Sequence, residues 1–300
     1  MPELPDIVVY IESLERHLVG KALQKIRIHS PFLLRNVEPP LEEFEGRIVQ
    51  RFRRLGKRIV FQFEGELFLI LHLMIAGRLQ WKSVRPAGRM GLACFDFDGG
   101  TLILTEAGTK RRASLHTARA ETQLLEHQPG GLEIFDSTVE DFTRALRSSN
   151  HTVKRSLTNP RIFSGIGNAY SDEILHHAML SPLTWTSLLT DAECERLFQS
   201  TQAVMQRFLS KLRQEVGDGF PTKVTAFRPD MAVHGRFKLP CPKCGTPVQR
   251  IVYSENETNY CPECQTQGKV LADRALSKLL KDDWPRSVEE WEEIRKPKLP

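Results

Sequence analysis

Four cysteines near the C-terminus have the spacing of a metal site. Cys241 and Cys244 form one C-x2-C pair, and Cys261 and Cys264 form another after sixteen intervening residues. Each pair places two thiolates on one tight turn, and two such turns complete a tetrahedral shell of sulfurs with no open position. A closed thiolate shell suits zinc and cannot activate water. The sequence therefore predicts one structural Zn²⁺, which staples a β-hairpin.

The N-terminus offers a second arrangement of chemical groups, Met1-Pro2-Glu3. If Met1 is removed, Pro2 presents a secondary amine with an ordinary pKa near ~8, so a fair fraction is neutral and nucleophilic at pH 7. An amine that attacks an aldehydic carbon forms an iminium, which is an electron sink. Glu3 beside it could serve as acid and base. Taken alone, a Pro-Glu start does not identify an enzyme.

Basic residues gather in three runs. They are Arg51, Arg53, Arg54, Lys57 and Arg58, then Lys110, Arg111 and Arg112, then Lys154 and Arg155. Phosphate backbones bind such patches and release counterions. Any single run is equally typical of a solvated surface. Three runs together with a zinc hairpin favour a nucleic acid as the partner.

A glycine-rich segment, SGIGNAY at 164–170, lies between two helical patterns. Its glycines allow a tight turn, and Asn168 is placed to cap the second helix. Free amides at a helix start bind phosphate well. The competing interpretation is a plain helix–turn–helix connection.

The composition bounds the class of protein. The chain has 300 residues, which is long enough for about two domains. Its net charge of +5 mildly favours anionic partners. No stretch approaches the ~18 apolar residues of a membrane span, and no signal peptide is apparent. We expect a cytoplasmic protein, nucleoid-associated if bacterial, without membrane partners or disulfides.

The apolar pattern predicts the elements that must position these residues. Residues 6–18 have helical spacing, and the strand pairs 59–63 with 67–73 and 92–97 with 101–105 read as hairpins of an antiparallel sandwich or barrel. The turn residues at 128–131 mark a domain boundary. A helical pattern then runs from about 138 to 214.

These features occur together, in this order, in one known family. The sequence resembles the formamidopyrimidine-DNA glycosylase / endonuclease VIII family of base-excision repair enzymes. The residues that carry the resemblance are PELPD at 2–6, LGKRIV at 55–60, HLMIAGRL at 72–79, SGIGNAYSDEIL at 164–175, and VHGR, CPKCGTPV and YCPECQ within 233–265.

The resemblance implies an α+β multidomain fold. It comprises an N-terminal helix on an antiparallel β-sandwich (1–128), a helix–two-turn–helix DNA-binding domain (129–232), a β-hairpin zinc finger (233–268) and, beyond the family pattern, a helical extension (269–300). The implied partner is damaged DNA with the damaged nucleotide flipped out. We also expect the protein to be a monomer.

The resemblance also implies the site residues. Pro2 attacks the sugar C1′ and displaces the damaged base, Glu3 handles protons, and β- then δ-elimination cuts the strand. Lys57 matches the lysine that contacts phosphate near the lesion, and Asn168 matches the phosphate-binding asparagine. Lys154 is a further expected DNA contact.

The chain departs from the family pattern where the protein fills the gap left by the flipped base. The usual methionine wedge aligns with Ile75, and the segment that carries its arginine and phenylalanine is replaced by AGTKRRAS, which contains Lys110, Arg111 and Arg112. The wedge phenylalanine is absent. The zinc hairpin has Asn256 in place of an arginine, at a cost in phosphate affinity. The loop at 217–232 is also unlike the oxidised-guanine recognition loop.

The leading hypothesis is a bifunctional DNA glycosylase and AP lyase, acting on damaged duplex DNA or on single-stranded or distorted DNA. The altered wedge and Asn256 motivate a second hypothesis, a non-catalytic damage- or structure-specific DNA-binding protein. A third, an RNA-binding zinc protein, leaves Pro2 and Glu3 unexplained.

Overall fold

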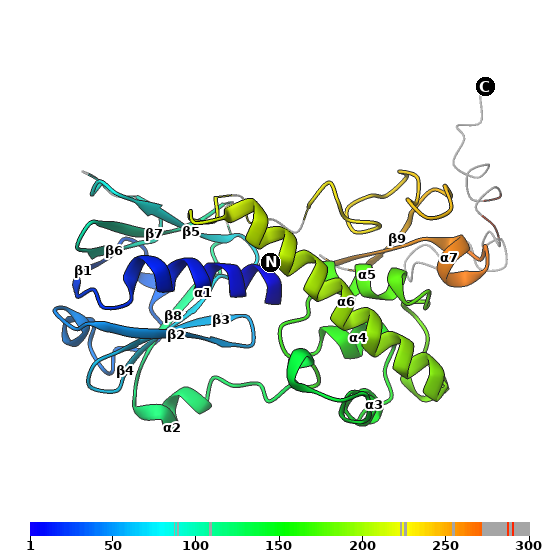
Figure 1. Cartoon of the computed structure of the whole chain (residues 1–300), viewed down its shortest axis with the longest axis horizontal. Helices are drawn as coiled ribbons and strands as arrows, with labels where there is room; N and C mark the ends of the chain where they lie inside the picture. The colour runs from blue at the N-terminus through cyan, green and yellow to red at the C-terminus, as the bar shows by residue number, and fades with distance from the viewer. Residues whose placement is uncertain are drawn as a thin grey trace. The chain divides into compact units, whose positions relative to one another are not determined.

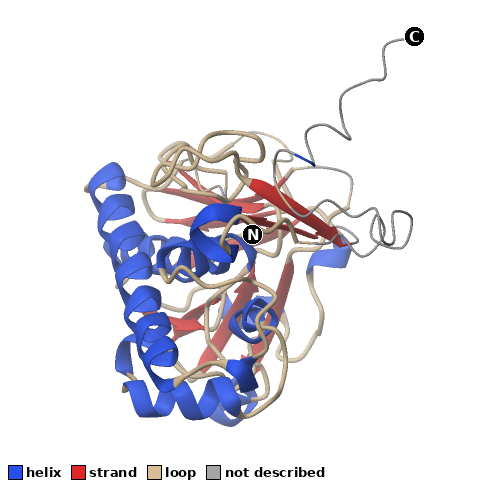
Figure 2. Cartoon of the chain, turned by 90° about the vertical axis from the view of Figure 1, so that its right-hand side faces the viewer, coloured by secondary structure: helices blue, strands red, loops and turns tan. Residues whose placement is uncertain are grey.

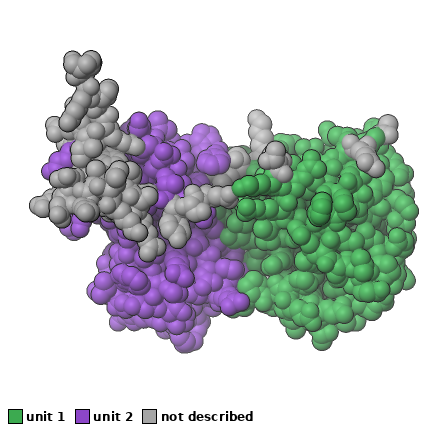
Figure 3. All heavy atoms as spheres, turned by 180° about the vertical axis from the view of Figure 1, so that it is seen from behind, with its two compact units in different colours: residues 1–130, 205–225 green, residues 131–204, 226–300 purple. Residues whose placement is uncertain are grey.

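The computed structural model describes residues 1–86, 88, 90–107, 110–222, 224, 227–253, 256–271, 287 and 290. The chain divides into two compact units, one formed by 1–130 with 205–225 and the other by 131–204 with 226–300 (Figure 3). The first boundary falls in the predicted loop at 128–131. The predicted helical extension lies outside the described residues from 272 onward, apart from 287 and 290.

The N-terminal unit begins with helix α1 (Leu4–Leu18), which confirms the helix predicted over 6–18. Its apolar face, which includes Ile7, Tyr10 and Leu14, is buried in the main hydrophobic core. The helix packs against strands β2 and β3 of the sandwich (Figure 1). The first helical turn is therefore fixed to the core, although Glu3 and Asp6 at this end are polar.

Two antiparallel four-stranded sheets form the sandwich. One has the order β1 (Leu23–Ile28), β6 (Ala93–Phe97), β7 (Gly100–Glu106), β5 (Gly77–Lys82), and the other the order β2 (Val49–Leu55), β3 (Arg58–Phe63), β4 (Leu67–His72), β8 (Ser114–Arg119). Both predicted hairpins are confirmed, as β3–β4 and β6–β7. The predicted fold class is therefore correct for this unit.

Strand β3 shows how the alternation builds the sandwich. Ile59, Phe61 and Phe63 point into the core between the sheets, because successive side chains of a strand face opposite sides. Val60 points the other way into a smaller apolar cluster that also contains Leu124 of helix α2 (Ala120–Leu125). The second sheet is thus covered on both faces.

The second unit is mainly helical. The helices among its described residues are α3 (Val139–Arg147), α4 (Val153–Thr158), α5 (Asn168–His177), the first part of α6 (Asp191–Val216) and α7 (Pro262–Thr266). Its described hairpin is β9 (Gln249–Tyr253) with β10 (Asn256–Tyr260). Short 3-10 turns occur in the two units at η1 (Pro31–Leu33), η2 (Leu41–Phe44), η3 (Ile134–Asp136) and η4 (Thr186–Leu188). Figure 2 distinguishes helices from strands by colour. The hairpin lies between the two cysteine pairs, as predicted.

Helix boundaries follow local signals. At the start of α3, Thr138 and Asp141 form a reciprocal capping box. None of the helices in the described part of the chain combines the length and apolar content that crossing a bilayer would require.

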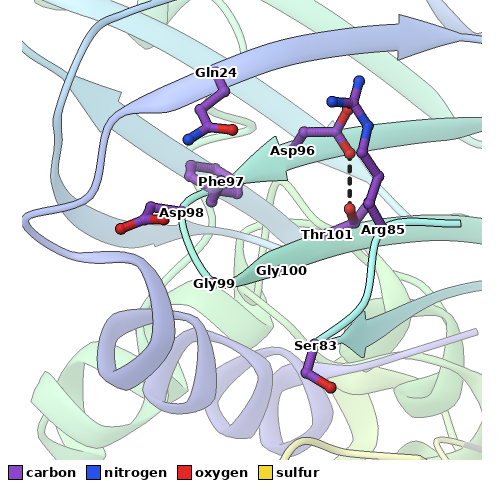
Figure 4. Close-up of a pocket in the computed structure, with 9 residues that line it drawn as sticks. All are labelled: Gln24, Ser83, Arg85, Asp96, Phe97, Asp98, Gly99, Gly100 and Thr101. Carbon is purple, nitrogen blue, oxygen red and sulfur yellow. Dashed lines mark hydrogen bonds and ion pairs between the residues drawn. The ribbon is translucent and has the colours of Figure 1, made fainter.

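A buried carboxylate fixes one edge of the first sheet. Asp96 on β6 accepts hydrogen bonds from Arg27 at 3.0 and 2.9 Å and from the Thr101 hydroxyl at 2.7 Å. Arg85 pairs with it at 2.8 Å. Arg85, Asp96 and Thr101 border a pocket of about 220 Å³ (Figure 4). Because both carboxylate oxygens have donors, the network serves to hold strands together.

The turn between β4 and β5 is unusually tight. The Gly77 amide donates to the Leu73 carbonyl at 2.9 Å, and a Cβ at Gly77 would lie 2.2 Å from that same oxygen. Met74 has a left-handed φ of 53°. The turn carries Ile75 at its tip, where the side chain is half exposed.

We expect Gly77→Ala to destabilise the N-terminal unit by about 1–3 kcal/mol, because the new methyl group overlaps backbone that cannot move away. Chemical denaturation measures the change. The matched control is Gly88→Ala, where a Cβ meets nothing within 4 Å and the effect should stay below about 0.5 kcal/mol. Equal stabilities for the two variants would contradict this description of the turn.

Candidate functional site

The first site element is the start of α1. Pro2 and Glu3 are both buried, and Glu3 is the residue that precedes the first helical turn. The backbone amide of Glu3 donates to Oδ2 of Asp6 at 2.9 Å. The N-terminal end of a helix carries partial positive charge, which favours a carboxylate and disfavours a cation there. The carboxyl group of Glu3 therefore lies beside the chain terminus.

The amine at the terminus lies among four charged side chains. Burial lowers the pKa of the Met1 amine, the carboxylates of Glu3 and Asp6 raise it, and the cations of Arg78 and Lys57 lower it. Burial also lowers the pKa of the Lys57 ammonium, while Glu3 opposes that shift. The structure therefore brings the predicted residues Pro2, Glu3 and Lys57 together.

Arg78 is a member of this site that the sequence analysis did not single out. It lies on β5 and reaches the terminus because α1 is tied to that strand: the Leu79 amide donates to the Tyr10 hydroxyl at 3.3 Å. The available signal was its place in the motif HLMIAGRL. Its place beside the chain terminus could not be predicted without knowing that α1 contacts β5.

His72 is a second residue near Lys57 that was not predicted. Its Nε2 is buried and has no hydrogen-bond partner among the described residues. Burial, followed by the charges of Arg58, Lys57 and His116, lowers the pKa of His72 to about 4. The ring is therefore neutral at pH 7.

The two basic runs of the first unit differ in whether their side chains bind other protein groups or are exposed to solvent. Arg53 forms a bidentate ion pair with Glu121 at 2.8 Å, and Arg54 donates to the Gly56 carbonyl at 2.7 Å. The second run, Lys110 to Arg112, is exposed on the loop between β7 and β8. Only this second run presents its side chains to solvent as a group.

In the second unit, helix α5 presents its polar face to the zinc module. Asn168 is the first helical residue and Gly167 precedes it, so the prediction that Asn168 caps the helix is wrong. The extended backbone of Gly167 starts the helix one residue earlier. Nδ2 of Asn168 instead donates to the carbonyl of Glu257 at 2.8 Å, beside Asn256 on β10. The structure thus brings the predicted Asn168 and Asn256 into one region.

Lys154 is used inside the protein. Its side chain is only 12% exposed and its ammonium pairs with Asp172, while it also donates to the Asn168 carbonyl and the Ser171 hydroxyl, each at 3.1 Å. Direct contact of Lys154 with DNA remains a prediction. Its observed bonds hold the first turn of α5 in place.

Asp172 and Glu173 join α5 to two segments of the zinc module. Asp172 Oδ2 accepts from the Asn259 amide at 3.1 Å and lies 2.8 Å from Nδ1 of His234. Glu173 accepts from three successive amides, those of Ala232, Val233 and His234, at 2.7, 2.9 and 3.0 Å. Burial raises the pKa of Glu173, and these amide bonds oppose the rise. The carboxylates replace the solvent that the buried amides have lost.

The four predicted cysteine ligands converge. All four sulfurs lie within 4.8 Å of one another, with Cys244–Cys261 at 3.4 Å and Cys241–Cys264 at 4.0 Å. A tetrahedron of sulfurs about 2.3 Å from a zinc ion has edges of about 3.8 Å, so the cluster fits that ion. The amide of Lys243 lies 3.4 Å from Cys241 Sγ, as expected of a knuckle around a metal.

The pairing register of the hairpin shows which cations its faces carry. Asn256 pairs with Tyr253, and Asn259 pairs with Arg250. Because residues alternate along strands, Arg250 and Asn256 belong to opposite faces. Arg250 is also engaged by Glu257 at 2.9 Å. Arg250 is therefore no substitute for the arginine that the family has at position 256.

Comparisons with known proteins agree along most of the chain. Three family models match: "Formamidopyrimidine-DNA glycosylase N-terminal domain" over residues 1–114, "Formamidopyrimidine-DNA glycosylase H2TH domain" over 133–216, and "Zinc finger found in FPG and IleRS" over 238–267. The zinc-finger match and the sulfur cluster establish one structural zinc ion at the four cysteines.

Similar relatives and structures extend the match. The formamidopyrimidine-DNA glycosylase of Thermus thermophilus is 32% identical over 281 residues, which cover 89% of this chain and 100% of the relative. An uncharacterised formamidopyrimidine-DNA glycosylase-like protein of Mycobacterium tuberculosis is 37% identical over 50% of this chain and 94% of its own length.

Among solved structures, the Thermus thermophilus MutM (Fpg) protein aligns with a TM-score of 0.72 and 29% identity, covering 88% of this chain and 98% of its own. A mutant Lactococcus lactis FPG in complex with Fapy-dG-containing DNA aligns with a TM-score of 0.76 and 25% identity, covering 88% and 100%.

We expect Asp172→Asn to destabilise the protein by about 3–5 kcal/mol, because it leaves the Lys154 ammonium buried without its carboxylate. Adding Lys154→Met removes the unpaired charge and should restore part of the loss. Chemical denaturation compares the single and double variants. Arg144→Met, which breaks an exposed ion pair with Asp141, is the control and should cost no more than about 1 kcal/mol. If the double variant were no more stable than Asp172→Asn alone, the pair would not be coupled as described.

Proposed function

Since this chain belongs to the formamidopyrimidine-DNA glycosylase family, we propose that it excises damaged bases from DNA and cuts the strand at the resulting abasic site. The observation that carries the proposal is the partly buried chain terminus, whose amine is affected by the charges of Glu3, Arg78 and Lys57. A terminal amine beside a carboxylate and two cations combines a nucleophile, a proton carrier and groups that attract phosphate.

The proposed chemistry requires removal of Met1, which frees the nitrogen of Pro2 as a secondary amine. This nitrogen attacks C1′ of the damaged nucleotide, and the bond from C1′ to the base breaks with its electron pair leaving on the base. Glu3 takes up the proton that the Pro2 nitrogen loses after attack and delivers it to the ring oxygen O4′ as the sugar opens, while the departing base takes a proton from water. An iminium between Pro2 and C1′ remains.

The iminium then acts as an electron sink for strand cleavage. Loss of a proton from C2′ expels the 3′ phosphate by β-elimination, and a further elimination expels the 5′ phosphate. Water hydrolyses the remaining iminium and regenerates the free amine. Burial, followed by the charges of Arg78 and Lys57, lowers the pKa of the terminal amine and so favours its neutral form. Lys57 is also the proposed phosphate contact next to the lesion.

The remaining predicted residues supply the grip on DNA. We assign phosphate contacts to Asn168 and to the exposed run Lys110, Arg111 and Arg112, and contact with the gap left by the flipped base to Ile75. Asn256 contributes a neutral amide on the hairpin. Lys154 is assigned a positioning role, since its ammonium holds the carbonyl of Asn168.

The substrate class is proposed from the altered residues. A wedge reduced to Ile75 and a hairpin with Asn256 instead of arginine favour lesions in DNA that is already distorted, including single-stranded DNA, besides damaged duplex. We also propose that the enzyme acts as a monomer in the cytoplasm. The non-catalytic alternative rests on Ile75 and Asn256 alone, and the relatives named above do not favour it.

Borohydride trapping tests the proposed function. Oligonucleotides that carry an abasic site, an oxidised or ring-opened purine, or an oxidised pyrimidine should form covalent adducts in duplex or single-stranded form. Pro2→Gly, or a tag left before Pro2, should abolish trapping, because each changes the attacking nitrogen. The same tag at the C-terminus is the control. Tight, salt-dependent DNA binding with no adduct on any substrate would instead support the non-catalytic alternative.

The pH dependence of trapping tests the role of Arg78. The attacking amine must be neutral, so the rate falls as the pH drops through its pKa, and a lowered pKa extends activity to lower pH. Arg78→Gln removes a charge that lowers this pKa. The acid limb of the trapping rate should therefore move to higher pH. Lys82→Gln, on the same strand but not among the charges that act on the amine, should leave the limb in place; an unmoved limb in Arg78→Gln would refute the assignment.

A further inference from the structure

A histidine from outside the zinc module lies within hydrogen-bond distance of the cysteine cluster. His176, in the last turn of α5, has its Nε2 3.2 Å from the sulfur of Cys241. Both side chains are buried, with His176 7% exposed and Cys241 2% exposed. The other donors described on the sulfurs, such as the amides of Lys243 and Cys264, belong to the cysteine knuckles themselves.

We propose that His176 is a positioning residue for the zinc ion, which donates its Nε2–H to the Cys241 thiolate and thereby stabilises metal binding. A zinc-bound thiolate is an acceptor only, so this contact requires the proton on Nε2. Four thiolates around one Zn²⁺ carry two excess negative charges, and a donor on a sulfur disperses part of that charge. Groups that support ligands in this way typically contribute 10–100-fold to metal affinity.

The position of His176 along α5 gives this bond a second consequence. Asn168 is eight residues earlier on the same helix, and Asp172 and Glu173 lie between them. These three residues bind the zinc module through the backbone of residues 232–234, Glu257 and Asn259. His176, unlike these three residues, contacts a metal ligand directly. The occupancy of the metal is therefore linked directly to the helix that begins with Asn168.

The contact depends on a donor at one place rather than on a ring of suitable size. Phenylalanine preserves the shape of the side chain but has no N–H. Glutamine can place its amide nitrogen near the position of Nε2, whereas the shorter asparagine cannot reach it. This set of substitutions separates the hydrogen bond from packing.

The experiment measures zinc transfer from the full-length protein to a chromogenic chelator, with no DNA present. The chelator concentration that removes zinc at equilibrium should be 10–100-fold lower for His176→Phe than for the unmodified protein. His176→Gln should remain within a few-fold of the unmodified protein, and His176→Asn should behave like His176→Phe. Circular dichroism before chelation checks that each variant is folded.

The neighbouring His177 supplies the matched control. It is exposed and its Nδ1 lies 2.9 Å from the Ser200 hydroxyl, away from the cluster. His177→Phe should retain zinc as the unmodified protein does. Zinc retention in His176→Phe equal to that of the unmodified protein, or equal loss in His176→Gln and His176→Phe, would overturn the proposal. If His176→Phe does not fold, the comparison of His176→Gln with His176→Asn still decides it. Because no lesion is involved, the outcome is independent of the proposed glycosylase chemistry.

Discussion

The burial of charge at the first turn of α1 is the constraint on which the N-terminal unit depends. A helix start that holds Glu3 and Asp6 out of solvent is stable only if the rest of the helix is firmly anchored. The anchor is the apolar face of α1, which lies in the core of the sandwich, and the bond from Leu79 to the Tyr10 hydroxyl. The sandwich thus holds Glu3 and Asp6 in fixed positions at its edge.

The second unit solves a similar problem with the polar face of α5. Asp172 and Glu173 are almost fully buried and take the place of water for backbone amides of the zinc module. Lys154 balances part of their charge. The metal and this face are complementary, because the zinc fixes the hairpin internally while α5 fixes it to the helical core.

The sequence was most informative where function depends on local spacing. The cysteine pairs, the Pro2-Glu3 start and the hairpins could be predicted, because each is written in a few consecutive residues. Arg78 and His72 were missed, because tertiary contacts bring them to the site: the contact of β5 with α1 positions Arg78, and the pairing of β4 with β3 positions His72. Lys154 looked like part of an exposed basic run, and nothing nearby in the sequence shows that Asp172 buries it. Asn168 was given a capping role because its type suits a cap, whereas the extended backbone of Gly167 begins the helix.

The tight turn below Ile75 also bears on how a β-branched side chain behaves there. Isoleucine has few accessible χ1 rotamers and loses about 0.5–1 kcal/mol of side-chain entropy on burial, compared with about 1.5–2 kcal/mol for methionine. It is shorter and cannot reshape itself to fill an irregular gap, as methionine does. A rigid turn that carries isoleucine therefore adapts less well to its surroundings than one that carries methionine, but it loses less side-chain entropy when it is buried. Such a side chain is better suited to a gap that is already present in distorted DNA than to a gap that the protein must open and fill itself.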